Sequence, residues 1–163
     1  MKVCCTCKIE KPFVDFSKDI SKKSKLRAQC RICDGIRKLK RINTEDGFLK
    51  TIYGNMIARK EASDKGLNRG KVQEVNFTLA ELMKKWEEHK KKYGQNCIYT
   101  GKPLFYKRDK LQIRGNQISI DRLDNNKPYT IDNIVFCSSY ANWVKGQVTI
   151  DMCKKILEIY NEK

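Results

Sequence analysis

Apolar residues in the middle of the chain recur at the three- and four-residue intervals of an amphipathic helix. Two sets share this spacing: Phe48, Leu49, Ile52, Tyr53, Met56 and Ile57, and then Leu79, Leu82, Met83 and Trp86. Residues 65–70, which include two glycines, interrupt the pattern between the two sets. We therefore expect residues 43–96 to form a connector of two helices.

Capping signals mark where the helices begin. Three helix starts are indicated: Asn43 or Thr44, Thr78 with Glu81 at capping-box spacing, and Ser138 or Ser139. Gly94 is placed to end the second helix, because glycine readily adopts the conformation that closes a helix.

The last third of the chain combines strand-like and helical patterns. Residues 118–123 alternate between apolar and polar, and residues 134–137 are almost continuously apolar, so both segments predict strands. Turn-forming residues fill 124–129 between them. With the helix that follows, these segments predict a strand–loop–strand–helix (ββα) unit within residues 97–163.

A final helix is expected near the C-terminus. Cys153, Ile156, Leu157 and Tyr160 lie on one of its faces, and we expect that face to join the core. The predicted fold class is α+β.

The first 42 residues differ from the rest in composition. They contain five of the eight cysteines and a net charge of +9, from thirteen basic and four acidic residues. Cys4-x2-Cys7 and Cys30-x2-Cys33 are separated by 22 residues, which is typical of two thiolate pairs that surround one zinc ion. A piece this small buries too little apolar surface to fold alone, so the metal would supply much of its stability.

We therefore predict a structural zinc module over residues 1–42. A redox Cys-x2-Cys pair and coincidental buried thiols are the alternatives, and no thioredoxin-like pattern surrounds either pair. Cys5, between the first two ligands, is expected to be a spare thiol that points away from the site.

The charge of the whole chain favours a polyanionic partner. Its formal net charge is +16 and its pI is about 9.6, so counterion release from a phosphate backbone would favour binding. Five basic residues are candidates to contact DNA: Arg31, and Arg37, Lys38, Lys40 and Arg41, of which the last four lie on a predicted helix after Cys33 and are well placed along phosphates. A lysine-rich surface that is merely solvated is the alternative.

The sequence gives no sign of a membrane or secretory role. No apolar stretch approaches the roughly 20 residues that span a bilayer, and no apolar run follows the first lysine. We expect an intracellular protein with reduced cysteines and no membrane partner.

Four segments, in this order, resemble the HNH (His-Me finger) endonucleases. They are CIYTGKPL at 97–104, SIDRLD at 119–124, YTIDNI at 129–134 and NWVKG at 142–146. The likeness is greatest to phage and virus members with an N-terminal Cys4 module, many of them free-standing homing endonucleases. It implies hydrolysis of phosphodiester bonds in double-stranded DNA by a ββα-metal unit in residues 97–163, by a monomer or homodimer with no small-molecule substrate.

Asp121 and Asn142 are the candidate ligands of a catalytic Mg²⁺ or Mn²⁺. Hard oxygen ligands suit these ions, and a strand end and the following helix can bring the two residues together across a ββα unit. The resemblance implies the same ligand role. It also implies that Asn133 orients the catalytic loop and that Lys145 lies near the phosphate. The alternative for Asp121 and Asn142 is a structural role as caps or loop braces.

Arg122 departs from the pattern of the family. It stands where the general-base histidine usually follows the metal-binding aspartate, and arginine stays protonated, so it is a poor base. It is suited to clamping a phosphate or stabilising charge. The candidates for water activation are then Asp124, metal-bound hydroxide or an unidentified group. His89, the only histidine, is expected to be a solvated helix residue, with a displaced base as the alternative.

Cys97 and Cys137 occupy places where many relatives have Cys-x2-Cys pairs. Thr100 and Tyr140 replace the second cysteine of each pair, so we expect two buried thiols rather than a second zinc site. Two other functions stay open for the chain. One is a catalytically inactive zinc-containing DNA-binding protein, such as a regulator or packaging accessory, and the other is an RNA-binding component.

Overall fold

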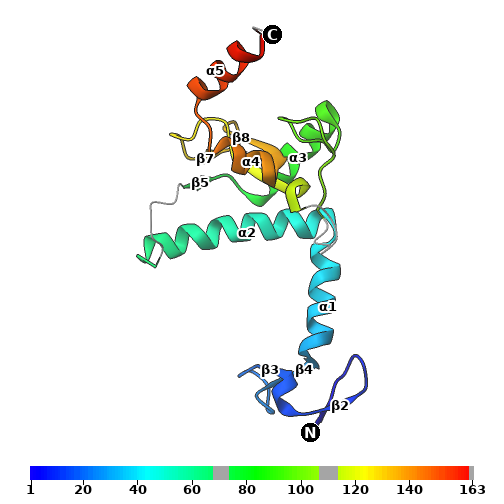
Figure 1. The fold of residues 1–163 in the computed structure, drawn as a ribbon. Coiled ribbons are helices and arrows are strands. Elements are labelled where there is room, and N and C mark those ends of the chain that lie inside the picture. The colour runs from blue at the N-terminus through cyan, green and yellow to red at the C-terminus, as the bar shows by residue number, and fades with distance from the viewer. Residues whose placement is uncertain (68–73, 107–113, 162–163) are drawn as a thin grey trace.

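The structure is a computed structural model that describes residues 1–67, 74–106 and 114–161. These residues form five α-helices, two short 3-10 helices and four two-stranded sheets. A small N-terminal module is joined by a single helix to a larger body, which we define as the described residues between 43 and 146 (Figure 1). The chain is therefore a mixed α and β protein, as predicted.

The N-terminal module consists of two short hairpins followed by a helix. β1 (Lys2–Val3) pairs with β2 (Glu10–Lys11), and β3 (Phe16–Lys18) pairs with β4 (Leu26–Cys30), both antiparallel. The 3-10 helix η1 (Phe13–Asp15) lies between the hairpins, and α1 (Arg31–Ile42) leaves the module after β4.

The connector contains the two predicted helices. α2 (Glu45–Asp64) begins where Thr44 Oγ1 accepts a hydrogen bond from the Gly47 N–H at 3.1 Å. α3 (Leu79–Tyr93) begins with the predicted capping box, in which Thr78 and Glu81 bond each other's backbone N–H groups. It ends at Gly94, whose φ is +66°. Of the predicted break at residues 65–70, positions 68–70 lie outside the described residues.

The ββα segment of the body also forms where it was predicted. β6 (Ile118–Arg122) and β8 (Ile134–Ser138) are antiparallel, with Asp121 opposite Val135. α4 (Ser139–Lys145) follows at once, capped by Ser138 Oγ, which accepts from the Ala141 N–H at 3.0 Å. The 3-10 helix η2 (Arg114–Asn116) precedes β6.

A parallel pair that the sequence did not predict ties the connector to the hairpin loop. β5 (Val75–Asn76) pairs with β7 (Tyr129–Thr130). The connector (residues 43–96) and the ββα segment after it share one core. This core includes Leu49 of α2, Leu82 and Trp86 of α3, and Phe136 of β8. The helices therefore support the hairpin directly.

The last helix, α5 (Ile150–Asn161), projects from the body (Figure 1). The prediction that its apolar face joins the core is wrong, because Cys153, Ile156, Leu157 and Tyr160 are all exposed. Its apolar periodicity is real, yet no described part of this chain covers it. Within the described part of the chain, no helix combines the length and the apolar character that crossing a bilayer requires.

Candidate metal centres and nucleic-acid interface

The four predicted zinc ligands meet in the N-terminal module. The sulfur atoms of Cys4, Cys7, Cys30 and Cys33 all lie within 4.8 Å of one another. Four bonds of about 2.3 Å in a tetrahedron place the sulfurs about 3.8 Å apart, so the cluster fits such an ion. These cysteines can hold a metal ion such as zinc. No other group of three or more His, Cys, Asp or Glu side chains among the described residues has comparable geometry.

The backbone of the module prepares Cys4 to ionise. The N–H groups of Cys30 and Thr6 donate to Cys4 Sγ at 3.3 and 3.5 Å. Hydrogen bonds from the backbone, that of Cys30 first, lower the pKa of Cys4 to about 5. The neighbouring Cys30 sulfur, and then burial, raise the pKa of Cys33 to about 12. The Cys4 thiolate thus forms readily, whereas that of Cys33 requires a cation to offset the effect of its neighbours.

Asp34 organises the basic residues at the start of α1. It is buried and accepts hydrogen bonds or ion pairs from Arg37 at 2.7 Å, Lys38 at 2.8 Å and Arg27 at 3.3 Å. The side chains of Lys38 and then Arg37 lower the pKa of Asp34 to about 2. The two cations are still more than half exposed, so Asp34 fixes their positions without covering them.

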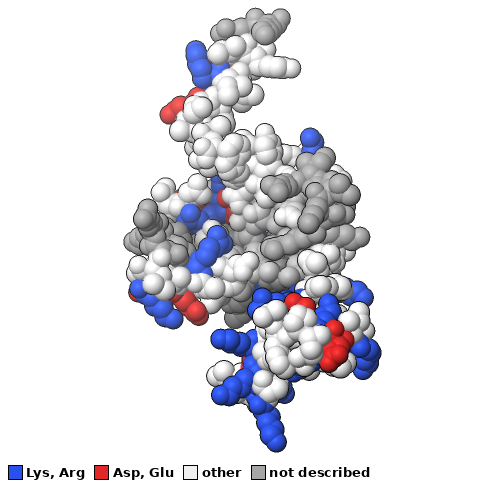
Figure 2. Space-filling view, turned by 60° about the horizontal axis from the view of Figure 1, so that its bottom comes forward, with Lys and Arg blue, Asp and Glu red and all other residues white. Residues whose placement is uncertain are grey.

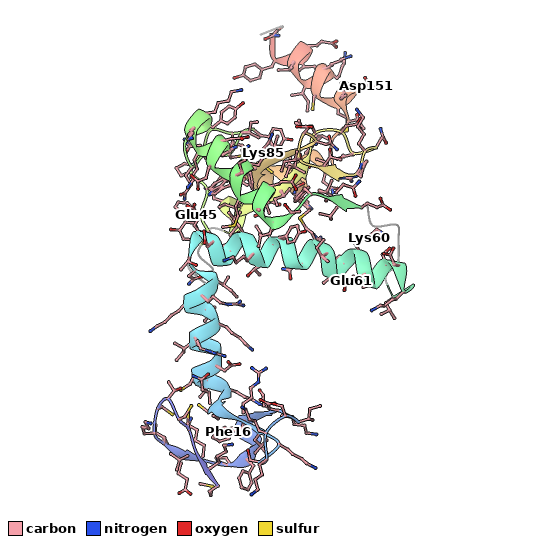
Figure 3. The ribbon with its side chains drawn as sticks, turned by 180° about the vertical axis from the view of Figure 1, so that it is seen from behind. Phe16, Glu45, Lys60, Glu61, Lys85 and Asp151 are labelled. Carbon is pink, nitrogen blue, oxygen red and sulfur yellow. The ribbon has the colours of Figure 1, made fainter. Side chains whose placement is uncertain are left out.

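The predicted DNA-binding residues are on the surface of α1. Arg31, Arg37, Lys38, Lys40 and Arg41 are all exposed, and Arg37, Lys38 and Arg41 line a hollow of about 310 Å³. Figure 2 shows Lys and Arg side chains crowded on the N-terminal part that faces the viewer. α1 crosses from the module to the body (Figure 3), which leaves this basic face open to a partner.

The opposite face of α1 carries an apolar stripe that the sequence reasoning missed. Ile32, Ile36 and Leu39 are 48–64 % exposed. Their spacing of four and three residues places them on one side of the helix, away from Arg37 and Arg41. The periodicity was present in the sequence, but the charges around it drew the interpretation toward the basic face.

Asp121 lies at the end of β6 and is almost fully buried. Its Oδ2 accepts a hydrogen bond from the Tyr99 hydroxyl at 2.5 Å and an ion pair from Lys145 Nζ at 2.8 Å. Lys145 Nζ also donates to the backbone carbonyls of Arg122 and, at 3.4 Å, Leu123. The last residue of α4 is thus fixed to the end of β6.

Asn142 lies beside the same strand. Its Nδ2 donates to Ser119 Oγ at 2.9 Å and to the Ile120 carbonyl at 3.2 Å. Because a backbone carbonyl can only accept, the bond to Ile120 identifies Nδ2 as the amide atom that faces the strand. Ser119 and Asp121 point to the same face of β6, since side chains alternate along a strand. The structure therefore brings Lys145 to Asp121, and Asn142 to the two residues that precede Asp121 in the same strand.

Asn133 braces the loop between the two strands. Its Oδ1 accepts from the Asp124 N–H at 2.9 Å, and its Nδ2 donates to the carbonyls of Asp124 and Pro128, both at 3.0 Å. The side chain is buried. Asn133 therefore ties residues 124 and 128 of this loop together.

Arg122 and Asp124 are engaged within that loop. Arg122 Nη1 donates to the carbonyls of Asn125 and Lys127 at 2.8 Å, and its guanidinium lies 5.0 Å from the centre of the Tyr129 ring. The Asn126 N–H, first among several contacts, lowers the pKa of Asp124. A carboxylate with a lowered pKa is a weaker base, so its surroundings do not favour Asp124 as the group that activates water.

His89 is buried, and the prediction that it is solvated is wrong. Its ring stacks on Trp86 at 5.3 Å and meets the edge of Phe136, and Nε2 bonds the Asn96 carbonyl at 2.7 Å. Burial lowers the pKa of His89, so the ring is neutral and forms part of the core. It follows Leu82 and Trp86 at helical spacing, a signal that the run of lysines beside it obscured.

Tyr99 is a contact of the candidate site that the sequence did not single out. Burial, and then its hydrogen bond to Asp121, raise the pKa of Tyr99. Cys97, two residues earlier, is buried and its sulfur accepts from the Ser138 N–H at 3.2 Å. Cys137 is buried too. Both are packing thiols, as predicted.

Comparisons of the chain with models of protein families, with curated proteins and with solved structures each found no match.

Proposed function

We propose that this chain is a metal-dependent DNA endonuclease of the HNH type. The observation that carries the proposal is that α4 sends two side chains to β6: Lys145 to the Asp121 carboxylate, and Asn142 to Ser119 and the Ile120 carbonyl. A carboxylate and an amide oxygen are ligands that Mg²⁺ and Mn²⁺ accept. The Lys145 ammonium, surrounded by Asp121 Oδ2 and two backbone carbonyls, indicates that a cation is stable there.

Asp121 and Asn142 would hold the divalent ion, which when bound polarises the phosphodiester and lowers the pKa of water. The protein's own part is to keep these groups in place. Tyr99 fixes the Asp121 carboxylate, Ser119 fixes the Asn142 amide, and Asn133 holds the loop rigid. Arg122 stiffens the same loop and supplies positive charge next to the site.

The N-terminal module would act as the DNA-gripping arm. We propose that the Cys4 cluster binds zinc as a structural ion, because thiolates prefer zinc to magnesium or manganese. The exposed cations of α1 would then contact phosphates of duplex DNA without reading bases. Competition between labelled duplex DNA and single-stranded RNA at a fixed salt concentration tests this assignment. Stronger competition by RNA would contradict it.

Plasmid cleavage tests the enzymatic proposal. Zinc-loaded protein with Mg²⁺ or Mn²⁺ should nick or linearise supercoiled plasmid, and Asp121→Asn should lose this activity by at least about a hundredfold. Asp151→Asn, on α5 (Figure 3), is the matched control and should cleave like the wild type. Intact plasmid with every divalent ion would contradict the proposal.

One observation favours a second function, a DNA-binding protein without cleavage. At the position where the family has its base, Arg122 is bonded to carbonyls of its own loop, and the Asp121 carboxylate is already neutralised by Lys145. Tight duplex binding by a protein that leaves plasmid intact would establish this function.

A further inference from the structure

Lys145 occupies the place where a divalent cation would approach Asp121. Its ammonium contacts Asp121 Oδ2 at 2.8 Å, the Arg122 carbonyl, and the Leu123 carbonyl at 3.4 Å. The Asp121 side chain is only 7 % exposed, while that of Lys145 is 29 % exposed. The carboxylate is therefore enclosed, and its present cation is the more accessible partner of the two.

We propose that Lys145 is a displaceable counter-ion of Asp121, released when a DNA phosphate draws its ammonium away, so that DNA and the divalent cation bind cooperatively. This inference rests on the proposed function, since it assumes that Asp121 is a metal ligand. It adds the condition under which that ligand becomes available.

The Lys145 ammonium and a divalent ion cannot both stay at the Asp121 carboxylate. An ammonium and a divalent ion at the same carboxylate oxygen repel each other strongly at low dielectric. Lysine is the partner that can leave, because its charge sits on a flexible four-carbon chain. Lys145 is also the last residue of α4, so its side chain can turn outward without disturbing the helix.

The rest of the site does not depend on Lys145. Tyr99 still donates to Asp121 after the lysine leaves, and Asn142 is held by Ser119 and Ile120. Departure of the ammonium would thus expose an already ordered carboxylate and amide. Coupling between two ligands is reciprocal. The divalent ion should therefore raise the affinity for DNA by the same factor by which DNA raises the affinity for the divalent ion.

Mn²⁺ binding to zinc-loaded, full-length protein tests this without any activity assay. Electron paramagnetic resonance of free Mn²⁺ should show weak binding by the wild type, and Lys145→Met should bind about tenfold more tightly or better, because a competing charged contact is removed. Lys145→Arg keeps the charge and should stay weak. Lys127→Met removes an equivalent charge from the neighbouring loop, where Lys127 pairs with Asp124, and should leave the affinity unchanged.

DNA affinity gives the second readout. Anisotropy of a labelled short duplex should show Mn²⁺ strengthening binding to the wild type more than to Lys145→Met, with Asp121→Asn reporting the effect of ionic screening alone. Thermal unfolding of each variant checks that it is folded.

Two results overturn the inference in different ways. If Asp121→Asn removes a Mn²⁺ site but Lys145→Met does not tighten it, the counter-ion role is wrong and the proposed function stands. If neither the wild type nor Lys145→Met has a Mn²⁺ site that Asp121→Asn removes, with or without DNA, the proposed function itself is wrong.

Discussion

Among the described residues, the N-terminal module buries three apolar side chains, whereas the body buries fifteen from its helices, hairpin and connecting loops. Two of the three in the module, Cys4 and Cys30, are candidate metal ligands, and Phe16 is the third. Phe16 lies inside the module in Figure 3. Hydrophobic burial can therefore stabilise the body, whereas the module depends on a metal ion bound by its four cysteine sulfurs.

Removing the metal should have the largest effect on this contrast. Chelation, or Cys30→Ser, should unfold residues 1–42 and leave the body folded, because metal binding supplies about 10 kcal/mol of folding free energy in such modules. Backbone NMR spectra of the full chain would show collapse of the module's signals alone. Cys5→Ser, at the exposed thiol, is the control and should retain one equivalent of zinc.

Truncating a core side chain of the body should give the reverse pattern. Leu82 is fully buried, so Leu82→Ala should lower the free energy of unfolding of the body by about 2–5 kcal/mol. Zinc content should not change. Leu157→Ala, on the exposed face of α5, should alter the free energy of unfolding by no more than about 0.5 kcal/mol. Denaturant unfolding measures both, and equal losses would mean that α5 is packed in solution.

The corner between α1 and α2 links the two regions and needs a glycine. A Cβ at Gly47 would overlap the Arg41 carbonyl, whereas nothing lies within 4 Å of one at Gly54. Gly47→Ala should therefore destabilise the protein by about 1–3 kcal/mol. Gly54→Ala should stabilise α2 by about 0.5–1 kcal/mol. Thermal melts of the two variants should show opposite shifts. A Gly47→Ala variant as stable as the wild type would mean that α1 and α2 do not approach this closely in solution.

Acid should weaken the body through His89. Burial lowers its pKa in the folded state, so below the unfolded value of about 6.5 the unfolded chain takes up a proton first. The stability that His89 contributes is thus present above about pH 6.5. It declines as the pH falls toward the lowered folded value. Urea titrations from pH 7.5 to 5 should show a smaller decline in His89→Gln, and the same decline in both would contradict the assignment.

Local signals in the sequence predicted the elements well. Thr44, Thr78 with Glu81, and Ser138 cap the helices they were expected to cap, because a cap is decided by three or four neighbouring residues. The Cys4 cluster was predictable for a similar reason, since the spacing of its pairs fixes the geometry of the sulfurs.

Burial and long-range contacts were harder to predict. The face of α5 has the same periodicity as a core helix, and only the fold shows that nothing in the described chain covers it. The lysines around His89 indicate a solvated position, whereas its place three residues after Trp86 on the same helix is typical of a core residue. Tyr99 is 22 residues from Asp121, so no pattern along the chain could indicate their contact.

The proposed function requires two different metals, one in each of two separate parts of the molecule. Anomalous diffraction from crystals of the protein with duplex DNA and Mn²⁺ tests it most directly. We predict a zinc signal among Cys4, Cys7, Cys30 and Cys33, and a manganese signal about 2.1 Å from oxygens of Asp121 and Asn142. A manganese signal elsewhere, or none, would contradict the account.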